Sequence, residues 1–294
     1  MRLLISGANG FLGTALIPVL EQRGHNVVRL VRRVESNLDI FWDPRNHTLD
    51  PGKLGNFDLV IHLAGANIAG KRWSESYKRE IWDSRIKATE LLAGGVLASG
   101  APPKIFLSMS GVGYYGSCGD RMLDESSPQG DDFMARLAIG WENASTPLSE
   151  AGVRVAHLRT SMVLSPTGGA LAKMLPPFKL GLGGRLGHGY QYWSWITLTD
   201  FLAAVVFIVE HDQLSGAINM TSPNPVTNRE FTATLAKAIH RPAFMPVPAF
   251  LLRALFGDMA DSVFFASQRA IPAKLTAAGF SFSDSILADA LSDS

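Results

Sequence analysis

Short apolar runs alternate with stretches of helical period through the first half of the chain. Five apolar runs predict strands, at Leu3–Ser6, Val27–Val31, Leu59–Leu63, Lys104–Ser108 and Val153–Leu158. Three longer patterns between them predict helices, at Phe11–Arg23, Glu75–Ala98 and Phe133–Glu150. Apolar strands separated by helices are typical of a parallel sheet that is covered on both faces. The pattern predicts an α/β fold built on a doubly wound parallel sheet, the Rossmann layout.

The second half of the chain differs from the first in its residue pattern. Residues 166–189 are rich in Gly and Pro and predict a long loop with one short helix around Leu171–Leu175. Further helices are expected at Asp200–His211 and Thr227–His240. We therefore expect a Rossmann domain at residues 1–165 and a smaller, substrate-side domain at residues 166–294, over the carboxyl edge of the sheet. Strands such as Gly216–Met220 could still return to the main sheet.

Composition narrows the classes of function. Of 294 residues, 27 are Lys or Arg and 26 are Asp or Glu, so the formal net charge is only +1. That balance argues against a nucleic-acid binder that works by neutralising phosphates. Apolar residues make up 47%, and a chain of this length buries about three quarters of its surface on folding. We expect a globular protein with a large core.

Other features bear on metals and compartment. Cys118 is the only cysteine, so neither an intrachain disulfide nor a multi-cysteine metal site can form. The seven His residues show no paired-ligand spacing, so we expect no metal. No apolar run approaches the ~20 residues of a membrane span, and the chain opens without a signal-peptide pattern. We expect a cytoplasmic protein that binds neither membrane nor nucleic acid.

The strongest motif is a glycine-rich turn between the first strand and the first helix. In such a turn one glycine allows the tight bend, a second lets the backbone approach a pyrophosphate, and a third allows close helix–strand packing. The helix N-terminus adds free N–H groups for the phosphates. A plain βα turn is the alternative. We predict a dinucleotide site that uses Gly7, Asn9, Gly10, Phe11, Leu12 and Gly13.

The end of the second strand distinguishes the two nicotinamide cofactors. NAD sites place an acidic residue there for the ribose hydroxyls, but the run Val27–Arg33 contains no Asp or Glu and ends in Arg32 and Arg33. A guanidinium group suits a 2′-phosphate through paired hydrogen bonds. A solvated strand end is the alternative. We predict NADP(H) as the cofactor.

These motifs resemble the short-chain dehydrogenase/reductase superfamily in its extended, nucleotide-sugar-epimerase-like branch. Within that branch the chain is similar to the atypical "epimerase family" proteins of bacteria and animals. The supporting stretches span nearly the whole sequence and include Lys71-Arg72-Trp73, Gly113-Tyr114-Tyr115-Gly116, Trp141-Glu142, Pro176-Pro177-Phe178 and Trp195-Ile196.

The resemblance implies places for further site residues. Leu63, Ala64 and Gly65 would lie beside the adenine and ribose. Ser108 and Ser110, at the end of the predicted strand Lys104–Ser108 and just beyond it, would lie near the nicotinamide. The helix that carries Glu80 and Arg85 would border the cofactor, with Arg85 on a phosphate or ribose and Glu80 on a ribose or adenine. Each of these side chains could instead be an ordinary structural residue.

The chain departs from the family where the family does its proton chemistry. Active members carry a Tyr-x-x-x-Lys pair on the helix that follows the strand equivalent to Lys104–Ser108. Here those positions fall on Met134 and Ala138, and Asp131–Ser149 contains no Tyr and no Lys. The Arg that grips a sugar-nucleotide diphosphate in related epimerases is replaced by Trp193. A nucleotide-sugar substrate is therefore not expected.

Two functions of different class remain. The first is an NADP(H)-dependent oxidoreductase or epimerase-like enzyme with an unknown small substrate. Ser110 would hold the substrate oxygen, and Tyr114 or Tyr115 would replace the missing acid, although packed aromatic side chains are the alternative for both. The second is a non-catalytic NADP(H)-binding sensor or scaffold. The sequence leaves the substrate, the oligomeric state and protein partners open.

Overall fold

The computed structural model describes residues 1–292, and its centre is an eight-stranded sheet. The strands lie in the order β12-β8-β6-β5-β1-β2-β3-β4. Their bounds are β1 Arg2–Ser6, β2 Asn26–Val31, β3 Asp39–Asp43, β4 Thr48–Leu49, β5 Leu59–His62, β6 Ile105–Gly111, β8 Arg154–Thr160 and β12 Gly216–Met220. β1 pairs in parallel with both β2 and β5, and β5 pairs in parallel with β6. The predicted doubly wound parallel sheet is confirmed.

The chain divides into two compact units made of interleaved segments. The first comprises Met1–Ser110, Leu137–Leu158 and Val206–Ala217. The second comprises Gly111–Arg136, Arg159–Val205 and the chain from Ile218 onward. The predicted boundary at residue 165 divides the chain into two continuous halves, whereas these units are interleaved. It therefore stays a prediction. The expectation that Gly216–Met220 returns to the main sheet is confirmed, because this segment is the edge strand β12.

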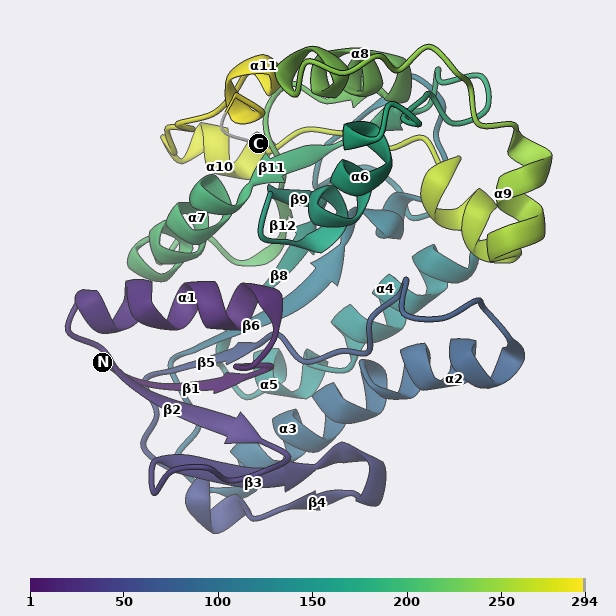
Figure 1. Ribbon diagram of the computed structural model, residues 1–294. Coiled ribbons are helices and arrows are strands. Elements are labelled where there is room, and N and C mark those ends of the chain that lie inside the picture. Colours follow the sequence, from purple (N-terminus) through teal and green to yellow (C-terminus); the bar gives the residue numbers. More distant parts are fainter. Residues whose placement is uncertain (293–294) are drawn as a thin grey trace. The chain divides into compact units, whose positions relative to one another are not determined.

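Helices cover the strands of the first unit on both faces. Figure 1 shows α1 (Phe11–Gln22) on one face, and α2 (Glu75–Asp83) and α3 (Ile86–Ala98) on the other. The prediction of one helix over Glu75–Ala98 is wrong at Ser84 and Arg85, which separate α2 from α3. Here Ser84 accepts a hydrogen bond from the backbone N–H of Ala66, so local contacts to a neighbouring loop compete with continuation of the helix.

The pattern over Phe133–Glu150 also forms two helices, α4 (Phe133–Asn143) and α5 (Thr146–Glu150). Pro147 occupies the first turn of α5. Proline has no N–H to continue a preceding helix but fits the start of a new one. The single-helix prediction is therefore wrong at residues 144–145.

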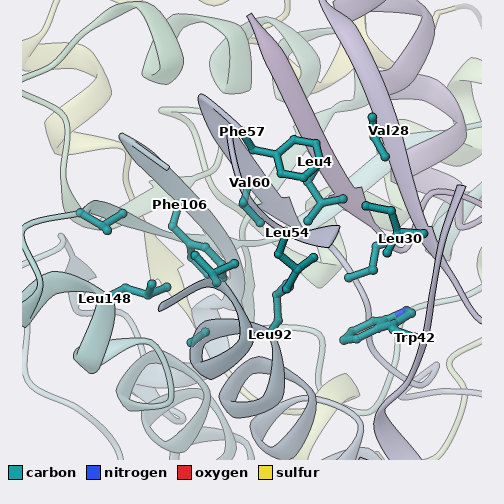
Figure 2. Packing of buried hydrophobic residues seen from close by; sticks show 14 of the residues in the cluster. Leu4, Val28, Leu30, Trp42, Leu54, Phe57, Val60, Leu92, Phe106 and Leu148 are labelled. Carbon is teal, nitrogen blue, oxygen red and sulfur yellow. The ribbon is translucent and has the colours of Figure 1, made fainter. Parts of the chain in front are cut away.

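The core of the first unit forms between the sheet and α3. Leu4, Val60 and Phe106 come from neighbouring strands, and each is fully buried. Figure 2 shows Leu92 of α3 and Leu54 turned toward one another beneath these strands. The sheet is thereby fixed to α3, which sets the position of the loops at the carboxyl ends of β1, β5 and β6.

The second unit contains short two-stranded sheets and several helices. Its strands are β7 Met122–Leu123, β9 Met162–Ser165, β10 Tyr192–Trp193, β11 Trp195–Thr197, β13 Val226–Thr227 and β14 Arg269–Ala270. Its helices are α6 Gly169–Lys179, α8 Asn228–Ala238, α9 Ala249–Phe256, α10 Ala273–Ala277 and α11 Leu287–Ala290; α7, Leu198–Glu210, starts in this unit and ends in the first.

Helix α6 is longer than the short helix expected around Leu171–Leu175. It continues to Lys179, although it contains Pro176 and Pro177. Leu171, Leu175 and Phe178 are all buried, and this helical spacing packs them into one cluster with Trp195 and Phe231. Burial of that stripe outweighs the backbone hydrogen bonds that the prolines remove.

Residues 1–292 contain neither a helix able to span a membrane nor a cluster of metal-binding side chains. Their helices include none with both the length and the apolar character needed to cross a bilayer. The same residues hold no cluster of three or more His, Cys, Asp or Glu side chains placed to bind a metal ion.

Candidate functional site

The glycine turn after β1 is closed tightly against the loop after β5. Gly7 has a positive φ of 73°, and a Cβ there would lie 2.7 Å from the carbonyl carbon of Leu63. A Cβ at Gly13 would collide with the carbonyl oxygen of Gly7. Both positions therefore require glycine. The turn comes directly out of β1 and opens α1, as the sequence predicted.

The start of α1 leaves backbone donors available. Gly10 is the N-cap residue and offers no side-chain cap, and the first turn contains no acidic side chain. The first N–H groups of a helix have no partner within the helix, and the helix dipole makes this end partly positive. The Gly10 N–H is already used, because it donates to the Gly7 carbonyl oxygen at 3.0 Å. An anion that approached Phe11 and Leu12 would meet the open N–H groups.

The turn lies at the topological switch point of the sheet. β2 lies on one side of β1 and β5 lies on the other. Ligands of open α/β sheets bind outside the carboxyl ends of the strands where the order reverses. Leu63, Ala64 and Gly65 follow β5 at this point, and Leu63 and Ala64 contact Gly7 across the gap between the two strands. The structure thus brings these predicted residues together with the glycine turn.

The buried side chain of Arg85 holds the loop after β5 in place. Its guanidinium group is buried and donates to the carbonyl oxygens of Ala66 at 3.0 Å and Ile81 at 3.2 Å. It also lies 5.0 Å from the ring centre of Trp141 and packs against Gly65. Burial lowers the pKa of Arg85 to about 10, so the group stays charged at neutral pH. This geometry favours a role in holding the loop; the phosphate or ribose contact stays a prediction.

Arg32 and Arg33 follow β2 and are exposed. Within residues 1–292, neither guanidinium group forms a hydrogen bond or an ion pair. The neighbouring Arg29 behaves differently, because Asp39 binds it through two hydrogen bonds of 2.8 and 2.9 Å. Two unpaired cations therefore remain at the strand end where the ribose of a dinucleotide is expected.

Glu80 lies in a surface ion pair. Its Oε1 accepts a 2.9 Å hydrogen bond from Arg45, and both side chains are at least one third exposed. Such pairs contribute little to stability. The predicted contact of Glu80 with ribose or adenine stays a prediction.

The end of β6 holds a buried hydroxyl–carboxylate pair that sequence reasoning missed. Ser110 Oγ donates to Glu142 Oε1 of α4 at 2.7 Å, and both residues are buried. Ser108 makes only a long contact, 3.3 Å, to the carbonyl oxygen of Met109. One sequence signal could have found the pair. Glu142 follows Ala138 by four residues, so Glu142 shares a helix face with Ala138, the position where the family carries Lys.

In the second unit, Tyr115 belongs to a closed hydrogen-bond network. Its hydroxyl donates to Asn219 Oδ1 at 2.7 Å and accepts from Arg159 at 3.1 Å. Burial raises the pKa of Tyr115 to about 12. Tyr114 packs edge-on against Tyr115, and the Arg159 guanidinium lies 3.4 Å from the centre of the Tyr114 ring. For both tyrosines, these contacts favour packing, the alternative to a catalytic role that the sequence left open.

Gln191, Trp193 and Trp195 of the second unit contact its interior. Gln191 donates to the carbonyl oxygens of Leu186 and Phe264, and Trp195 is fully buried. Trp193 packs edge-on against Phe231. These contacts favour structural roles over a pocket lining.

Glu125 and Met134 also belong to the second unit, and both have partners there. Glu125 accepts hydrogen bonds from the backbone N–H groups of Asn219 and Lys274. Met134, at the family's Tyr position, packs against Gly113.

Comparison with known proteins decides the family. The model of the NAD dependent epimerase/dehydratase family matches residues 3–220 of the chain. This protein belongs to that family. A second model, a domain of unknown function named DUF1731, matches residues 247–294.

Relatives within the family cover the whole chain. An epimerase family protein of Mycobacterium bovis is 43% identical over 288 residues, which are 98% of this chain and 95% of that protein. The human epimerase family protein SDR39U1 is 37% identical over 296 residues, covering 100% of this chain and 99% of that protein. The crystal structure of human SDR39U1 (isoform 2) with NADPH superposes with a TM-score of 0.92 at 36% identity, covering 100% of this chain and 98% of that one. The expected resemblance is confirmed.

Proposed function

We propose that this protein binds NADP(H) and is an oxidoreductase of the short-chain dehydrogenase/reductase type that acts on a small substrate. The observation that carries the proposal is the glycine turn at the switch point of the sheet, with two unpaired arginines at the end of the adjacent strand and no acidic residue there. The NADPH in the crystal structure of the human relative supports it.

The residues present fit the cofactor. The N–H groups at Phe11 and Leu12 would bind the pyrophosphate, since α1 leaves them open, and Gly10 would let the backbone approach it. Arg32 and Arg33 would bind the 2′-phosphate. Leu63 to Gly65 would bound the adenine and ribose side, held in place by Arg85. Bound NADP(H) supplies or accepts a hydride, while the protein orients it.

Because the chain has a single cysteine, the reducing cytoplasm stays the expected compartment.

A second function, binding of NADP(H) without catalysis, is favoured by one observation. The proton of the Tyr115 hydroxyl is committed to Asn219, and Met134 and Ala138 cannot titrate. This function predicts tight NADPH binding and no turnover with any alcohol or carbonyl compound.

NADPH titration of a Gly10→Ala variant tests the proposal. Gly10 has an ordinary negative φ of −85°, and a Cβ there would meet only the Gly7 carbonyl oxygen, at 3.2 Å. The variant should therefore fold, but its methyl group would enter the space where the pyrophosphate approaches. We expect NADPH affinity, measured by nucleotide fluorescence, to fall at least tenfold.

Gly94→Ala is the matched control, because Gly94 is an exposed helical residue whose Cβ would contact nothing. It should bind NADPH like the wild type and be slightly more stable. Wild-type protein without NADPH affinity, or a Gly10→Ala variant with unchanged affinity, contradicts the proposal.

A further inference from the structure

The pair of Ser110 and Glu142 is the one buried hydroxyl–carboxylate contact described at the carboxyl ends of the first unit's strands within residues 1–292. Ser110 is 4% exposed and Glu142 is 9% exposed. A carboxylate so placed costs free energy unless polar groups satisfy it. Ser110 comes from β6 and Glu142 from α4, so the contact is a tertiary one that the fold has to maintain.

The direction of this hydrogen bond limits what Ser110 can bind. A serine hydroxyl has one hydrogen and two lone pairs. Its hydrogen is directed to Glu142, so only lone pairs remain for a third group. A carbonyl oxygen is itself an acceptor and cannot pair with Ser110 in this state. A substrate hydroxyl can, by donating to Ser110 Oγ.

The position of Ser110 matches that of a residue that touches substrate. β6 pairs with β5 in the register His62 to Ser108. Ser110 therefore lies two residues further on the same side of β6, toward the carboxyl ends where ligands of such sheets bind. On α4, Ala138 occupies the position where the resemblance expects the family's lysine. Glu142 lies one helical turn further along the same face.

We propose that Ser110 and Glu142 form the proton-accepting pair of the site, and that its substrate is a secondary alcohol bound through its hydroxyl group. This inference rests on the proposed NADP(H) function and names its substrate class. Ser110 is the residue that touches the substrate, and Glu142 acts through Ser110.

The proton and electron movements balance. The alcohol O–H bond breaks and its proton passes to Ser110 Oγ, while the proton of Ser110 passes to the Glu142 carboxylate. The carbinol C–H bond breaks with its electron pair, and this hydride goes to NADP⁺. The alcohol is oxidised to a carbonyl compound, NADP⁺ is reduced to NADPH, and Glu142 ends protonated. The reverse reaction starts from protonated Glu142.

Kinetics of Glu142→Gln test the pair. The glutamine keeps an oxygen that can accept from Ser110 but cannot take up the proton. We use matched alcohol and ketone pairs of graded size: 2-butanol with butanone, cyclohexanol with cyclohexanone, and 1-phenylethanol with acetophenone. With NADP⁺, at least one alcohol should be oxidised by the wild type. Its kcat should fall 10²- to 10⁴-fold in Glu142→Gln, with KM changed less than about threefold.

Binding without turnover gives a second readout. NADPH cannot accept a hydride, so alcohols added to the NADPH complex form a dead-end complex, which nucleotide fluorescence reports. We expect the alcohol to bind more tightly than its ketone, and Ser110→Ala to abolish that preference. Glu150→Gln, an identical change of an exposed glutamate on α5, should leave kcat and binding unchanged.

NADPH affinity is measured first, so that the two proposals can fail separately. If the wild type does not bind NADPH, the proposed function itself is contradicted. If it binds NADPH but oxidises none of the alcohols, or if Glu142→Gln keeps the wild-type kcat, the proton-accepting pair is contradicted while NADP(H) binding stands.

Discussion

His62 is completely enclosed at the end of β5. Its Nδ1 lies 2.6 Å from Ser6 Oγ, and its ring meets Trp42 edge-on at 5.9 Å between centroids. Removal from water disfavours the charged imidazolium and lowers the pKa of His62 to about 3. His62 is therefore neutral at physiological pH, and its role beside the site is to pack β1 against β5.

This burial predicts a pH dependence of stability. The folded pKa lies below the value of about 6.5 for an unfolded histidine. Between these values the unfolded chain binds one more proton than the folded chain, so stability falls as pH falls. From pH 7 to pH 5 the His62 contribution amounts to about 2 kcal/mol. Urea unfolding at pH 7 and at pH 5 measures the effect. From pH 7 to pH 5 the free energy of unfolding of His62→Gln should fall by about 2 kcal/mol less than that of the wild type.

The comparison rests on the pH slope and not on absolute stability, because the substitution itself also disturbs packing. His188→Gln is the control, since His188 is exposed, and its curve should run parallel to that of the wild type. Parallel curves for the wild type and His62→Gln would show that His62 is not held neutral by burial.

At the scale of elements, one side chain holds the chain at the end of α7. Arg154 of β8 donates to the carbonyl oxygens of Ile208, Val209, His211 and Leu214. The last carbonyl groups of a helix have no partner within it, and a cation there also opposes the negative end of the helix dipole. Arg154 thus joins the end of α7 to β8, the strand next to the edge strand β12.

Arg154→Met should lower the free energy of unfolding by about 2 to 4 kcal/mol, because several carbonyl groups lose a charged donor at once. Chemical denaturation measures the loss. Arg154→Lys should lose less, since its ammonium group can still reach some of these oxygens. A loss below about 0.5 kcal/mol for the methionine variant would contradict this account.

How much the sequence could predict differed between elements. The ends of the five predicted strands and of α1 agree with the structure to within three residues, because the apolar runs of these strands are continuous and buried. β3 was missed because Asp39–Asp43 contains only three consecutive apolar residues, and Phe41 in their middle is exposed. The breaks between α2 and α3 and between α4 and α5 were missed because tertiary contacts and a local proline overrode the periodicity.

The site was predictable where a backbone turn defines it. Gly7, Gly13 and the loop after β5 meet as expected, because glycine spacing reports local geometry. The contact of Ser110 with Glu142 was not predictable, since it joins residues 32 positions apart. The inward turn of Arg85 could not be foreseen either, because a helical arginine by default faces water.

At the scale of the whole molecule, the family fold is kept and its usual proton donor is lost. The strand order, the glycine turn and the match to relatives over the full chain all belong to the NAD dependent epimerase/dehydratase family. The resemblance places the family's Tyr and Lys positions at Met134 and Ala138, and Asp131–Ser149 contains no Tyr and no Lys. In the proposed function, cofactor binding rests on the first unit's turn and arginines and does not depend on which residue moves the proton.

The most direct test of this account compares the affinities of NADPH and NADH for the wild type and for an Arg32→Ala, Arg33→Ala double variant. We predict that the wild type binds NADPH at least tenfold more tightly than NADH, since the exposed arginines suit a 2′-phosphate. The double variant should lose this preference, with NADH affinity changed less than threefold.

Arg23→Ala, at the far end of α1, should retain the wild-type preference. Equal binding of NADPH and NADH by the wild type, or a preference for NADPH that survives the loss of both arginines, would contradict the account.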